Sequence, residues 1–245
     1  MEVRAAQRPT QPVTPLRLGA IERGASIADQ VFRTLRSSIV TMRLTPATAL
    51  SEQEIAGRLK VSRQPVREAF IKLSEIGLVR VLPQRGTFVV KISAKDVADA
   101  RLVREAVECA IARRASEGIG KSAIEELRSI LAEQRKAARD PKAFFVLDEA
   151  FHRGLASAAD CIYAWKVIED AKAQMDRVRF LSLPHATPVR HLIKQHQAIL
   201  DAVAAGRAAA AEQAMKVHLR EILKSLPLLA RDFPDMFETS EAKIA

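Results

Sequence analysis

The chain has 245 residues, of which 48% are hydrophobic, 4% aromatic and 28% charged, and its formal net charge at pH 7 is +10. This length suits two domains of unequal size, and the scarcity of aromatic residues favours helices over sheets. No segment reaches the roughly 18 consecutive apolar residues of a membrane span, which excludes a helical membrane protein.

The excess positive charge lies in the first 95 residues. They contain 16 Lys and Arg against 7 Asp and Glu, a net charge of +9. Residues 96–245 contain 23 Lys and Arg against 22 Asp and Glu, a net charge of +1. A generally basic surface would spread the charge more evenly, whereas a domain that binds DNA phosphates requires such a concentration. We therefore expect the N-terminal part of the chain to bind nucleic acid.

Two features bear on the cellular location. Residues 1–25 have scattered arginines and no apolar segment, which predicts a flexible basic arm instead of a signal peptide. Cys109 and Cys161 show no metal-type spacing, and we expect them to be reduced thiols. Together the two features favour a cytoplasmic protein, and the family resemblance described below implies a bacterial one that associates with the nucleoid by binding DNA.

Residues 26–90 are expected to form a winged helix-turn-helix domain. Apolar residues at every fourth position predict a first helix over residues 26–42, which packs across the next two helices. Ser51 has the position of a capping residue for the second helix. Ser62 is expected to cap the third helix, which carries Pro65 in its first turn. A β-hairpin with a basic tip follows, and the Arg and Gln side chains at the start of the third helix indicate a DNA-reading element.

Residues 91–95 are expected to link this domain to an all-α domain over residues 96–230. Helical periodicity with short breaks at Gly, Pro and Asp favours a bundle of six helices. Residues 231–245 have weak periodicity and are expected to form a loosely docked tail. The predicted helices span residues 96–117, 121–138, 141–158, 162–182, 187–205 and 208–226.

Three of these predicted helices each carry titratable groups on an otherwise apolar face. Asp148 and His152 are spaced i,i+4 on one helix, His196 lies on a second helix and His218 on a third. Three neutral imidazoles and one carboxylate suit Zn²⁺, Ni²⁺, Co²⁺ or Mn²⁺, and they leave coordination positions for water or for a ligand carboxylate. The alternatives are satisfied core histidines and a surface Asp/His pair.

Motifs that would indicate an enzyme are missing from the sequence. No glutamate lies within a His motif as a general base, and there is no His-Glu-x-x-His, Gly-rich phosphate loop or Gly-x-Ser-x-Gly elbow. A metal-dependent enzyme with a DNA-binding appendage is therefore the weaker interpretation, and no catalytic residue is assigned.

Taken together, these residues resemble the GntR family of bacterial transcriptional regulators, in particular its FadR-like branch with a C-terminal FCD effector-binding domain. The run VSRQPVREAFIKLSEIGLVRVLPQRGTFV, residues 61–89, resembles the helix-turn-helix and wing of that family. The four candidate metal ligands match the metal pattern of the branch. The resemblance covers about residues 26–226.

By this resemblance, the start of the third helix reads DNA in the major groove and the wing approaches the minor groove. Arg63 contacts guanine, and Arg67 contacts bases or phosphates unless it pairs with Glu68 or Glu75. The expected DNA-binding residues are Gln53, Ser62, Arg63, Gln64, Pro65, Arg67, Arg85 and Gly86.

The resemblance further implies a homodimer that binds a pseudo-palindromic operator and represses a catabolic operon. Arg104 matches the arginine that pairs with an effector carboxylate, with an i,i+4 bridge to Glu108 as the alternative. Arg177 and Arg179 are further candidates for the effector cavity. Two other possibilities stay open: a regulator that senses metal alone, and one whose polar cavity binds an effector without metal.

Overall fold

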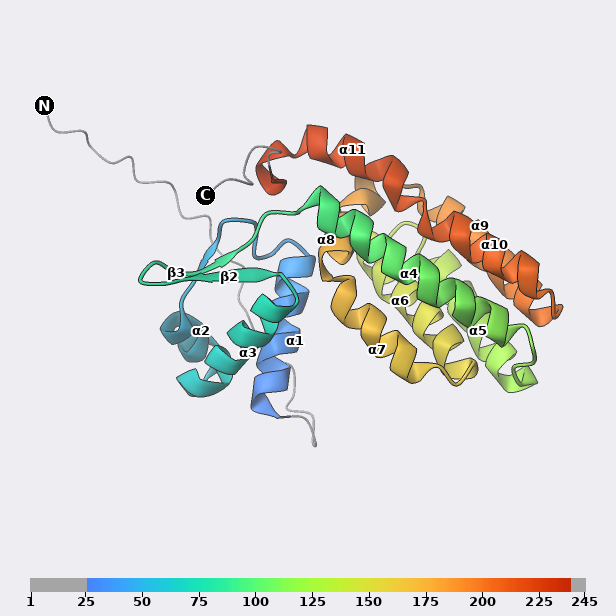
Figure 1. Ribbon diagram of the computed structural model, residues 1–245, viewed down its shortest axis with the longest axis horizontal. Helices are drawn as coiled ribbons and strands as arrows, with labels where there is room; N and C mark the ends of the chain where they lie inside the picture. Colours follow the sequence, from blue (N-terminus) through green and yellow to red (C-terminus); the bar gives the residue numbers. More distant parts are fainter. Residues whose placement is uncertain (1–25, 239–245) are drawn as a thin grey trace, which may run out of the picture.

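A computed structural model describes residues 26–238, apart from the side chains of Pro184 and His185, and shows a small mixed domain joined to a larger helical one (Figure 1). The expected basic arm, residues 1–25, and residues 239–245 of the expected tail lie outside this part of the chain. None of the described helices is long and apolar enough to cross a membrane. The predicted fold class, a winged helix-turn-helix followed by an all-α bundle, is confirmed.

The small domain consists of three helices and an antiparallel sheet in the strand order β1-β3-β2. In this sheet Leu50 is paired with Thr87, and Val79 with Val89. The elements of the domain are α1 (Ile27–Val40), β1 (Ala49–Leu50), α2 (Glu52–Leu59), α3 (Arg63–Glu75), β2 (Val79–Leu82) and β3 (Gly86–Val89).

The ends of these elements follow local chemistry. The Ser51 hydroxyl accepts a hydrogen bond from the Glu54 N–H at 3.3 Å and caps α2 as expected. Ser62 occupies the N-cap position of α3, but its hydroxyl makes no capping hydrogen bond. Gly86 opens β3 with a φ of +100°, a conformation that favours glycine and permits the tight hairpin tip.

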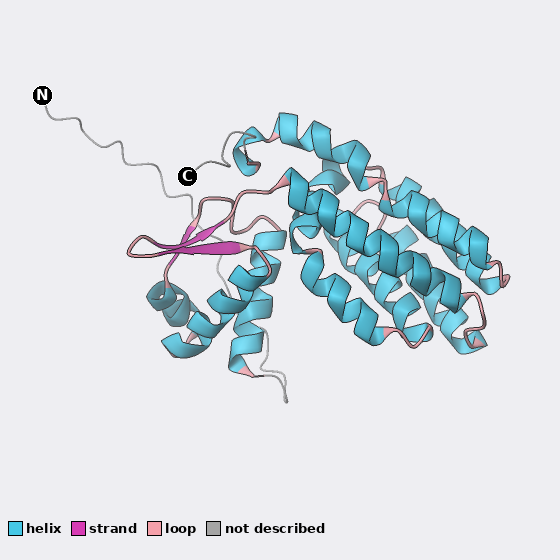
Figure 2. Ribbon diagram, in the orientation of Figure 1, coloured by secondary structure: helices cyan, strands magenta, loops and turns pink. Residues whose placement is uncertain are grey.

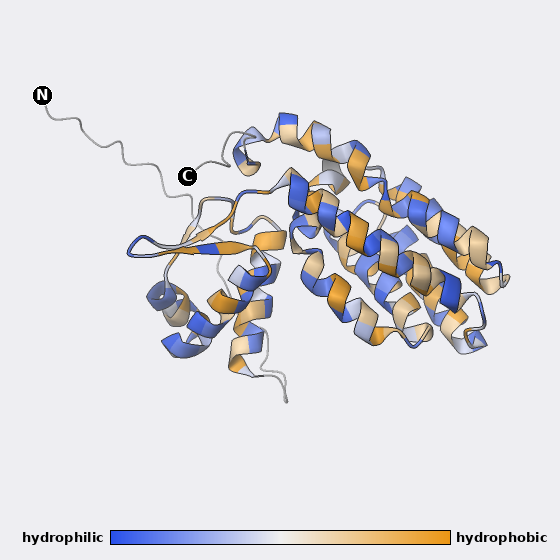
Figure 3. Cartoon of the chain, in the orientation of Figure 1, coloured by the Kyte–Doolittle hydropathy of each residue, from blue (hydrophilic) through white to orange (hydrophobic). Residues whose placement is uncertain are grey.

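The apolar sides of α1, α2 and α3 meet in one core beneath the sheet. Ala173, from the larger domain, belongs to the same cluster of buried side chains. Hydrophilic residues predominate on α2 and at the tip of the β2–β3 hairpin, as Figure 3 shows. The core residues of the small domain itself include Val31, Leu35, Ile39, Ile55, Leu59, Val66, Phe70, Leu73, Leu78, Val79 and Val89.

The larger domain is a helical bundle (Figure 2), in which α4 packs along α10, α10 along α9, and α5 along α6. Its main core contains the fully buried Phe151 and Leu155 of α6 and Ile199 of α9. The elements are α4 (Ala94–Ala115), α5 (Lys121–Lys136), α6 (Pro141–Ala158), α7 (Ile162–Ala171), α8 (Ala173–His185), α9 (Val189–Ala204), α10 (Ala208–Leu219), α11 (Ile222–Asp232) and the 3₁₀ helix η1 (Pro234–Met236).

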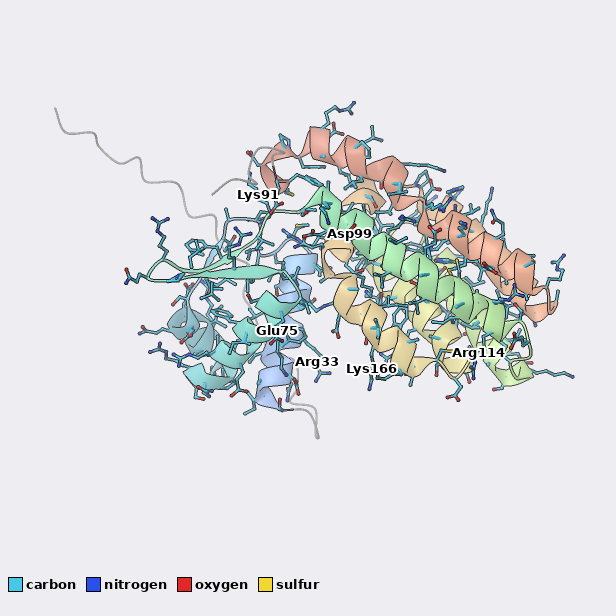
Figure 4. The ribbon with its side chains drawn as sticks, viewed as in Figure 1. Arg33, Glu75, Lys91, Asp99, Arg114 and Lys166 are labelled. Carbon is cyan, nitrogen blue, oxygen red and sulfur yellow. The ribbon has the colours of Figure 1, made fainter. Side chains whose placement is uncertain are left out.

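The chain passes from one domain to the other within a few residues. Lys91 and Asp99, both labelled in Figure 4, lie on either side of the start of α4. The Ser93 side chain caps α4, which begins at Ala94. The expected linker, residues 91–95, therefore overlaps the first turn of α4.

Two predicted helices are wrong in their extent. The helix expected over residues 162–182 is interrupted at Lys172, where α7 ends and α8 begins. The helix expected over residues 208–226 ends at Leu219, and α11 then carries Pro227 in its interior. Burial of one apolar side of α11 compensates for the single backbone hydrogen bond that proline cannot donate.

The expectation of a loose tail over residues 231–245 is wrong for the described part of that segment. Phe237 is only 4% exposed and forms a parallel bridge to Ile92. The Ile92 N–H donates to the Met236 carbonyl at 2.8 Å, and the Glu238 N–H donates to the Ile92 carbonyl at 2.9 Å. The segment after α11 is thus tied to the connection between the domains.

Candidate functional site

The expected DNA-binding residues lie on the surface of the small domain. The hairpin tip and α2 are at the end of the molecule away from the larger domain (Figure 1). Gln64 donates from Nε2 to Glu68 Oε1 at 3.0 Å. Pro65 is partly buried, and the exposed members of the set are Gln53, Ser62, Arg63, Gln64, Arg67, Arg85 and Gly86.

The Glu52 carboxylate of α2 forms ion pairs with both arginines at the start of α3, the helix expected to contact DNA bases. Arg63 Nη2 lies 3.1 Å from Glu52 Oε2, and Arg67 donates from Nε and Nη2 to the two Glu52 oxygens, each at 3.1 Å. Arg67 is thus paired with Glu52 instead of with Glu68 or Glu75. Hydrogen bonding by Arg67, and to a lesser extent by Arg63, lowers the pKa of Glu52 although partial burial opposes this. The side chains of Arg63 and Arg67 remain 63% and 55% exposed, so DNA can reach them.

The four candidate metal ligands meet inside the larger domain. Asp148 and His152 of α6, His196 of α9 and His218 of α10 are all buried, and one ligand atom from each lies within 4.8 Å of the others. The Nε2 atom of His218 is 3.1 Å from His152 Nε2 and 3.2 Å from His196 Nε2. Asp148 Oδ1 is 3.5 Å from His196 Nε2. Ligands at about 2.1 Å from one metal ion are about 3.0–3.4 Å apart, so the spacing fits.

The other nitrogen of each imidazole faces an oxygen acceptor. His152 Nδ1 lies 2.5 Å from Glu108 Oε2, a close contact that lacks the angles of a hydrogen bond. His196 Nδ1 lies 2.9 Å from Gln134 Oε1, and the orientation of that amide is set because its Nε2 donates to a backbone carbonyl. His218 Nδ1 lies 3.0 Å from Gln195 Oε1. These hydrogen bonds place the ring proton of His196 and of His218 on Nδ1, and the Glu108 carboxylate favours a proton on Nδ1 of His152.

This tautomer leaves three Nε2 lone pairs directed at one another in a buried space. Lone pairs at such distances repel unless a cation lies between them, and oxygen acceptors on the opposite nitrogen are usual for histidines that bind metal. Burial lowers the pKa of His196 and of His218 well below the ordinary value of histidine, and the neighbouring imidazoles act in the same direction. Neutral imidazoles are the form that binds a metal, so the donor set fits a divalent ion.

A cavity opens beside these four groups. Arg104 Nε donates to Glu108 Oε1 at 2.5 Å, which is the i,i+4 bridge given above as the alternative for Arg104. Its Nη2, however, has no hydrogen-bond partner among the described residues. Burial alone would raise the pKa of Glu108, but Arg104 and His152 outweigh it and hold that pKa well below its usual range. The cavity is lined by Arg104, Asp148, Arg179, Ser182, Thr187, His218 and Glu221, and by the apolar side chains Phe144, Phe145, Met175, Leu183, Leu192, Leu219 and Ile222.

Sequence reasoning missed the residues that orient the histidines. Gln134 comes from α5 and is 62 positions from His196, so no local spacing connects the two. Gln195 directly precedes His196 in the sequence but lies against His218 Nδ1. This contact depends on the packing of α9 on α10, so it could not be predicted from spacing along the chain. The i,i+4 spacing of Glu108 from Arg104 indicates their pairing but not the contact of Glu108 with His152.

Comparisons with known proteins agree with this arrangement. The family model described as "Bacterial regulatory proteins, gntR family" matches residues 27–89, and the one described as "FCD domain" matches residues 99–221. The first match covers the winged helix-turn-helix, and the second covers all four candidate metal ligands.

Similar proteins carry matching names. The HTH-type transcriptional repressor RspR of Escherichia coli (strain K12) is 42% identical over 239 residues, which cover 97% of this chain and 99% of that protein. An HTH-type transcriptional regulator of Streptomyces ambofaciens is 36% identical over 214 residues, 87% of this chain and 91% of that protein. These relatives are named as transcriptional regulators and not as enzymes.

Solved structures show the same fold. A transcriptional regulator GntR from Rhodococcus sp. RHA1 has a TM-score of 0.66 and 29% identity, covering 83% of this chain and 99% of its own. E. coli McbR/YncC has a TM-score of 0.73 and 18% identity, covering 85% of this chain and 99% of its own. The chain therefore belongs to the gntR family of bacterial regulatory proteins, has a C-terminal FCD domain, and is a DNA-binding transcriptional regulator.

Proposed function

We propose that this regulator is a homodimeric repressor, and that a small carboxylate bound beside a divalent metal in the FCD domain controls its affinity for the operator. The observation that carries the metal part is the convergence of three imidazole Nε2 atoms whose Nδ1 atoms all face oxygen acceptors. Repression is supported by the name of the E. coli relative that is 42% identical.

The DNA half of the proposal depends on α3 and the wing. In a homodimer, two copies of α3 would meet two half-sites, and the dimer geometry would set their spacing. Arg63 would contact guanine, and Arg67, Gln64 and Gln53 would contact bases or phosphates near it. Arg85 would enter the minor groove at the hairpin tip.

The effector half depends on the charge of the cavity. Arg104 and Arg179 both lie in its wall, and Arg104 Nη2 is without a partner among the described residues. A carboxylate would form charge-assisted hydrogen bonds there, while the apolar wall would contact its carbon skeleton. A bound metal would be held by Asp148, His152, His196 and His218, and it would add positive charge that attracts a carboxylate.

The test measures operator binding by fluorescence anisotropy. The operator is first selected from random-sequence DNA by the protein itself, and the metal-stripped protein is then loaded with Zn²⁺, Ni²⁺, Co²⁺ or Mn²⁺. A panel of small mono- and dicarboxylates is added with each metal. We expect at least one acid to lower operator affinity by about fivefold or more, but only with metal present.

Arg104→Gln is expected to raise about tenfold the acid concentration that is needed to lower operator affinity, because a buried charge-assisted contact with the acid is lost. Its matched control is Arg101→Gln, one turn earlier on α4, where Arg101 pairs with Glu105. Equal responses of the two variants would contradict the role of Arg104. A response to metal alone would indicate a metal sensor, and an undiminished acid response after chelation would indicate an effector that needs no metal.

A further inference from the structure

Helix α8 lies between the cavity and the small domain and contacts both. Met175, Arg179 and Leu183 line the cavity. Ala173, the first residue of the helix, belongs to the core of the small domain. Figure 1 shows α8 at the junction of the two domains, where it packs against α1 and α4. A displacement of this one helix therefore reaches both the cavity and the DNA-binding domain.

Side chains of α8 donate hydrogen bonds to backbone carbonyls at the ends of both DNA-binding elements. Gln174 Nε2 donates to the Gly77 carbonyl at 2.5 Å, just after α3. Arg177 Nη1 donates to the Val90 carbonyl at 2.9 Å, just after the wing, and to Gln174 Oε1 at 3.1 Å. Arg177, a cavity candidate by sequence, therefore faces the small domain, and the domains have a defined contact.

Asp176 uses its two carboxylate oxygens on different partners. It is 1% exposed. Its Oδ1 accepts a hydrogen bond from Arg179 Nη1 at 3.0 Å, on the side of the cavity. Its Oδ2 accepts one from Arg36 Nη2 of α1 at 3.1 Å, on the side of the small domain, and another from Lys172 Nζ at 2.6 Å. Asp176 thus joins a cavity arginine to an arginine of the DNA-binding domain.

Arg179 extends this chain of charges to the candidate metal centre. It pairs with Asp148 through Nη2, and its Nη1 lies 3.9 Å from Glu149. Lys172 Nζ completes the group by donating to Glu149 at 2.8 Å. The network contains three cations and three carboxylates, so every carboxylate has cationic partners. In a buried network of this kind, a change in one pair alters the strength of the next. The members are Arg36, Asp148, Glu149, Lys172, Asp176 and Arg179.

We propose that Asp176 couples the cavity to the DNA-binding domain. A metal on Asp148 would withdraw negative charge from Arg179, so Arg179 would turn toward Asp176 and compete there with Arg36. A carboxylate bound to Arg179 would act in the opposite direction and leave Asp176 to Arg36 and Lys172. This inference rests on the proposed function and adds the route by which occupancy of the site alters the position of α1.

The test compares hydrogen–deuterium exchange of the full-length, metal-stripped protein with and without Zn²⁺. In the wild type we expect Zn²⁺ to slow exchange in α6, α9 and α10, which carry the ligands, and to change exchange in α1 by about fivefold or more, the lower end of ordinary couplings. In Arg36→Gln and in Asp176→Asn the response of the ligand helices should persist, while that of α1 should disappear.

Two features of the design separate coupling from simple loss of stability. Arg36→Gln leaves Asp176 paired with Lys172 and Arg179, so the buried carboxylate keeps partners and the variant is expected to fold. The matched control is Arg113→Gln, which removes an exposed ion pair between Arg113, near the C-terminal end of α4, and Glu212 of α10. This control should respond to Zn²⁺ as the wild type does, and thermal unfolding of each variant verifies its fold.

Each outcome bears on a different claim. The coupling through Asp176 is wrong if α1 responds to Zn²⁺ equally in the wild type and in both variants. It is also wrong if, in the wild type, the ligand helices respond and α1 does not. In both cases the proposed metal centre is unaffected. If Zn²⁺ leaves α6, α9 and α10 unaffected, the proposed metal centre is wrong, and the coupling falls with it. Operator affinity supplies a second readout, since its response to the acid in the presence of Zn²⁺ should be lost in both variants.

Discussion

Gln134 allows the metal centre to be tested without changing a ligand. Its side chain is fully buried. Its Oε1 accepts a hydrogen bond from His196 Nδ1 at 2.9 Å, and its Nε2 donates to the Leu147 carbonyl at 3.0 Å. Gln134→Leu keeps a similar volume but removes both contacts. His196 then loses the acceptor that holds its ring and its tautomer, and the Leu147 carbonyl keeps only its hydrogen bond within α6.

Two magnitudes follow for this variant. Losing an oxygen that orients a metal-bound histidine typically costs about 10–100-fold in metal affinity, or about 1.4–2.8 kcal/mol. Leaving the buried Nδ1–H of His196 without an acceptor costs about 1–3 kcal/mol whether or not metal is bound. For a protein of this size each kcal/mol lowers the melting temperature by about 2–4 °C. The metal-free variant should therefore melt several degrees below the metal-free wild type.

Zn²⁺ affinity is measured by competition with a chromophoric chelator, and stability by thermal unfolding in excess chelator. The matched control is Gln197→Leu. Gln197 directly follows His196 on α9 and is bonded to Arg135 and Asp201, away from the cluster. If Gln134→Leu binds Zn²⁺ as tightly as Gln197→Leu does, His196 is not a metal ligand oriented by Gln134. A variant that loses stability but keeps its affinity leads to the same conclusion.

Two further predictions concern DNA reading and pH. Glu52→Gln should raise affinity for non-operator DNA severalfold and lower the ratio of operator to non-operator affinity, since it frees Arg63 and Arg67 from a carboxylate that repels every phosphate. Glu54→Gln on the same helix is the control, and Arg63→Ala should abolish the preference for the operator. Anisotropy titrations against operator and non-operator DNA measure both affinities. If Glu52→Gln leaves their ratio unchanged, this reasoning is contradicted. The metal-free protein should lose stability as pH falls from 7 to 5. The pKa values of His196 and His218 are lowered in the folded state, so only the unfolded chain takes up protons at these two positions. At pH 5 this proton uptake lowers the free energy of unfolding by up to about 2 kcal/mol for each histidine. Chemical denaturation in chelator measures this, and replacing both histidines by Asn should flatten the profile; an unaltered slope would show that these two are not the cause.

Local sequence signals were sufficient for most of the small domain. The apolar spacing of its helices and the capping position of Ser51 depend on neighbours within a few residues, so they could be predicted without the fold. The ligand cluster was predictable for a similar reason. Asp148 and His152 are one turn apart, and His196 and His218 each interrupt an apolar stripe, which already indicates burial with partners.

Helix ends in the larger domain were less predictable. Pro227 is a local signal for the end of a helix, yet α11 continues through it because burial of its apolar side outweighs one missing hydrogen bond. The interruption at Lys172 had no comparable signal. It coincides with the site where Lys172 contacts Asp176 of α8 and Glu149 of α6, and such contacts form only when the helices are packed.

By itself the sequence determined that this protein has a basic winged helix-turn-helix, a helical second domain and four groups able to bind a metal. These features depend on residue type and on spacing along one helix. Tertiary structure alone decided which oxygen each histidine faces, that Glu52 holds Arg63 and Arg67, and that Asp176 joins Arg179 to Arg36. Those contacts connect residues as far apart as 140 positions, and no periodicity along the chain encodes a distance between side chains on different helices.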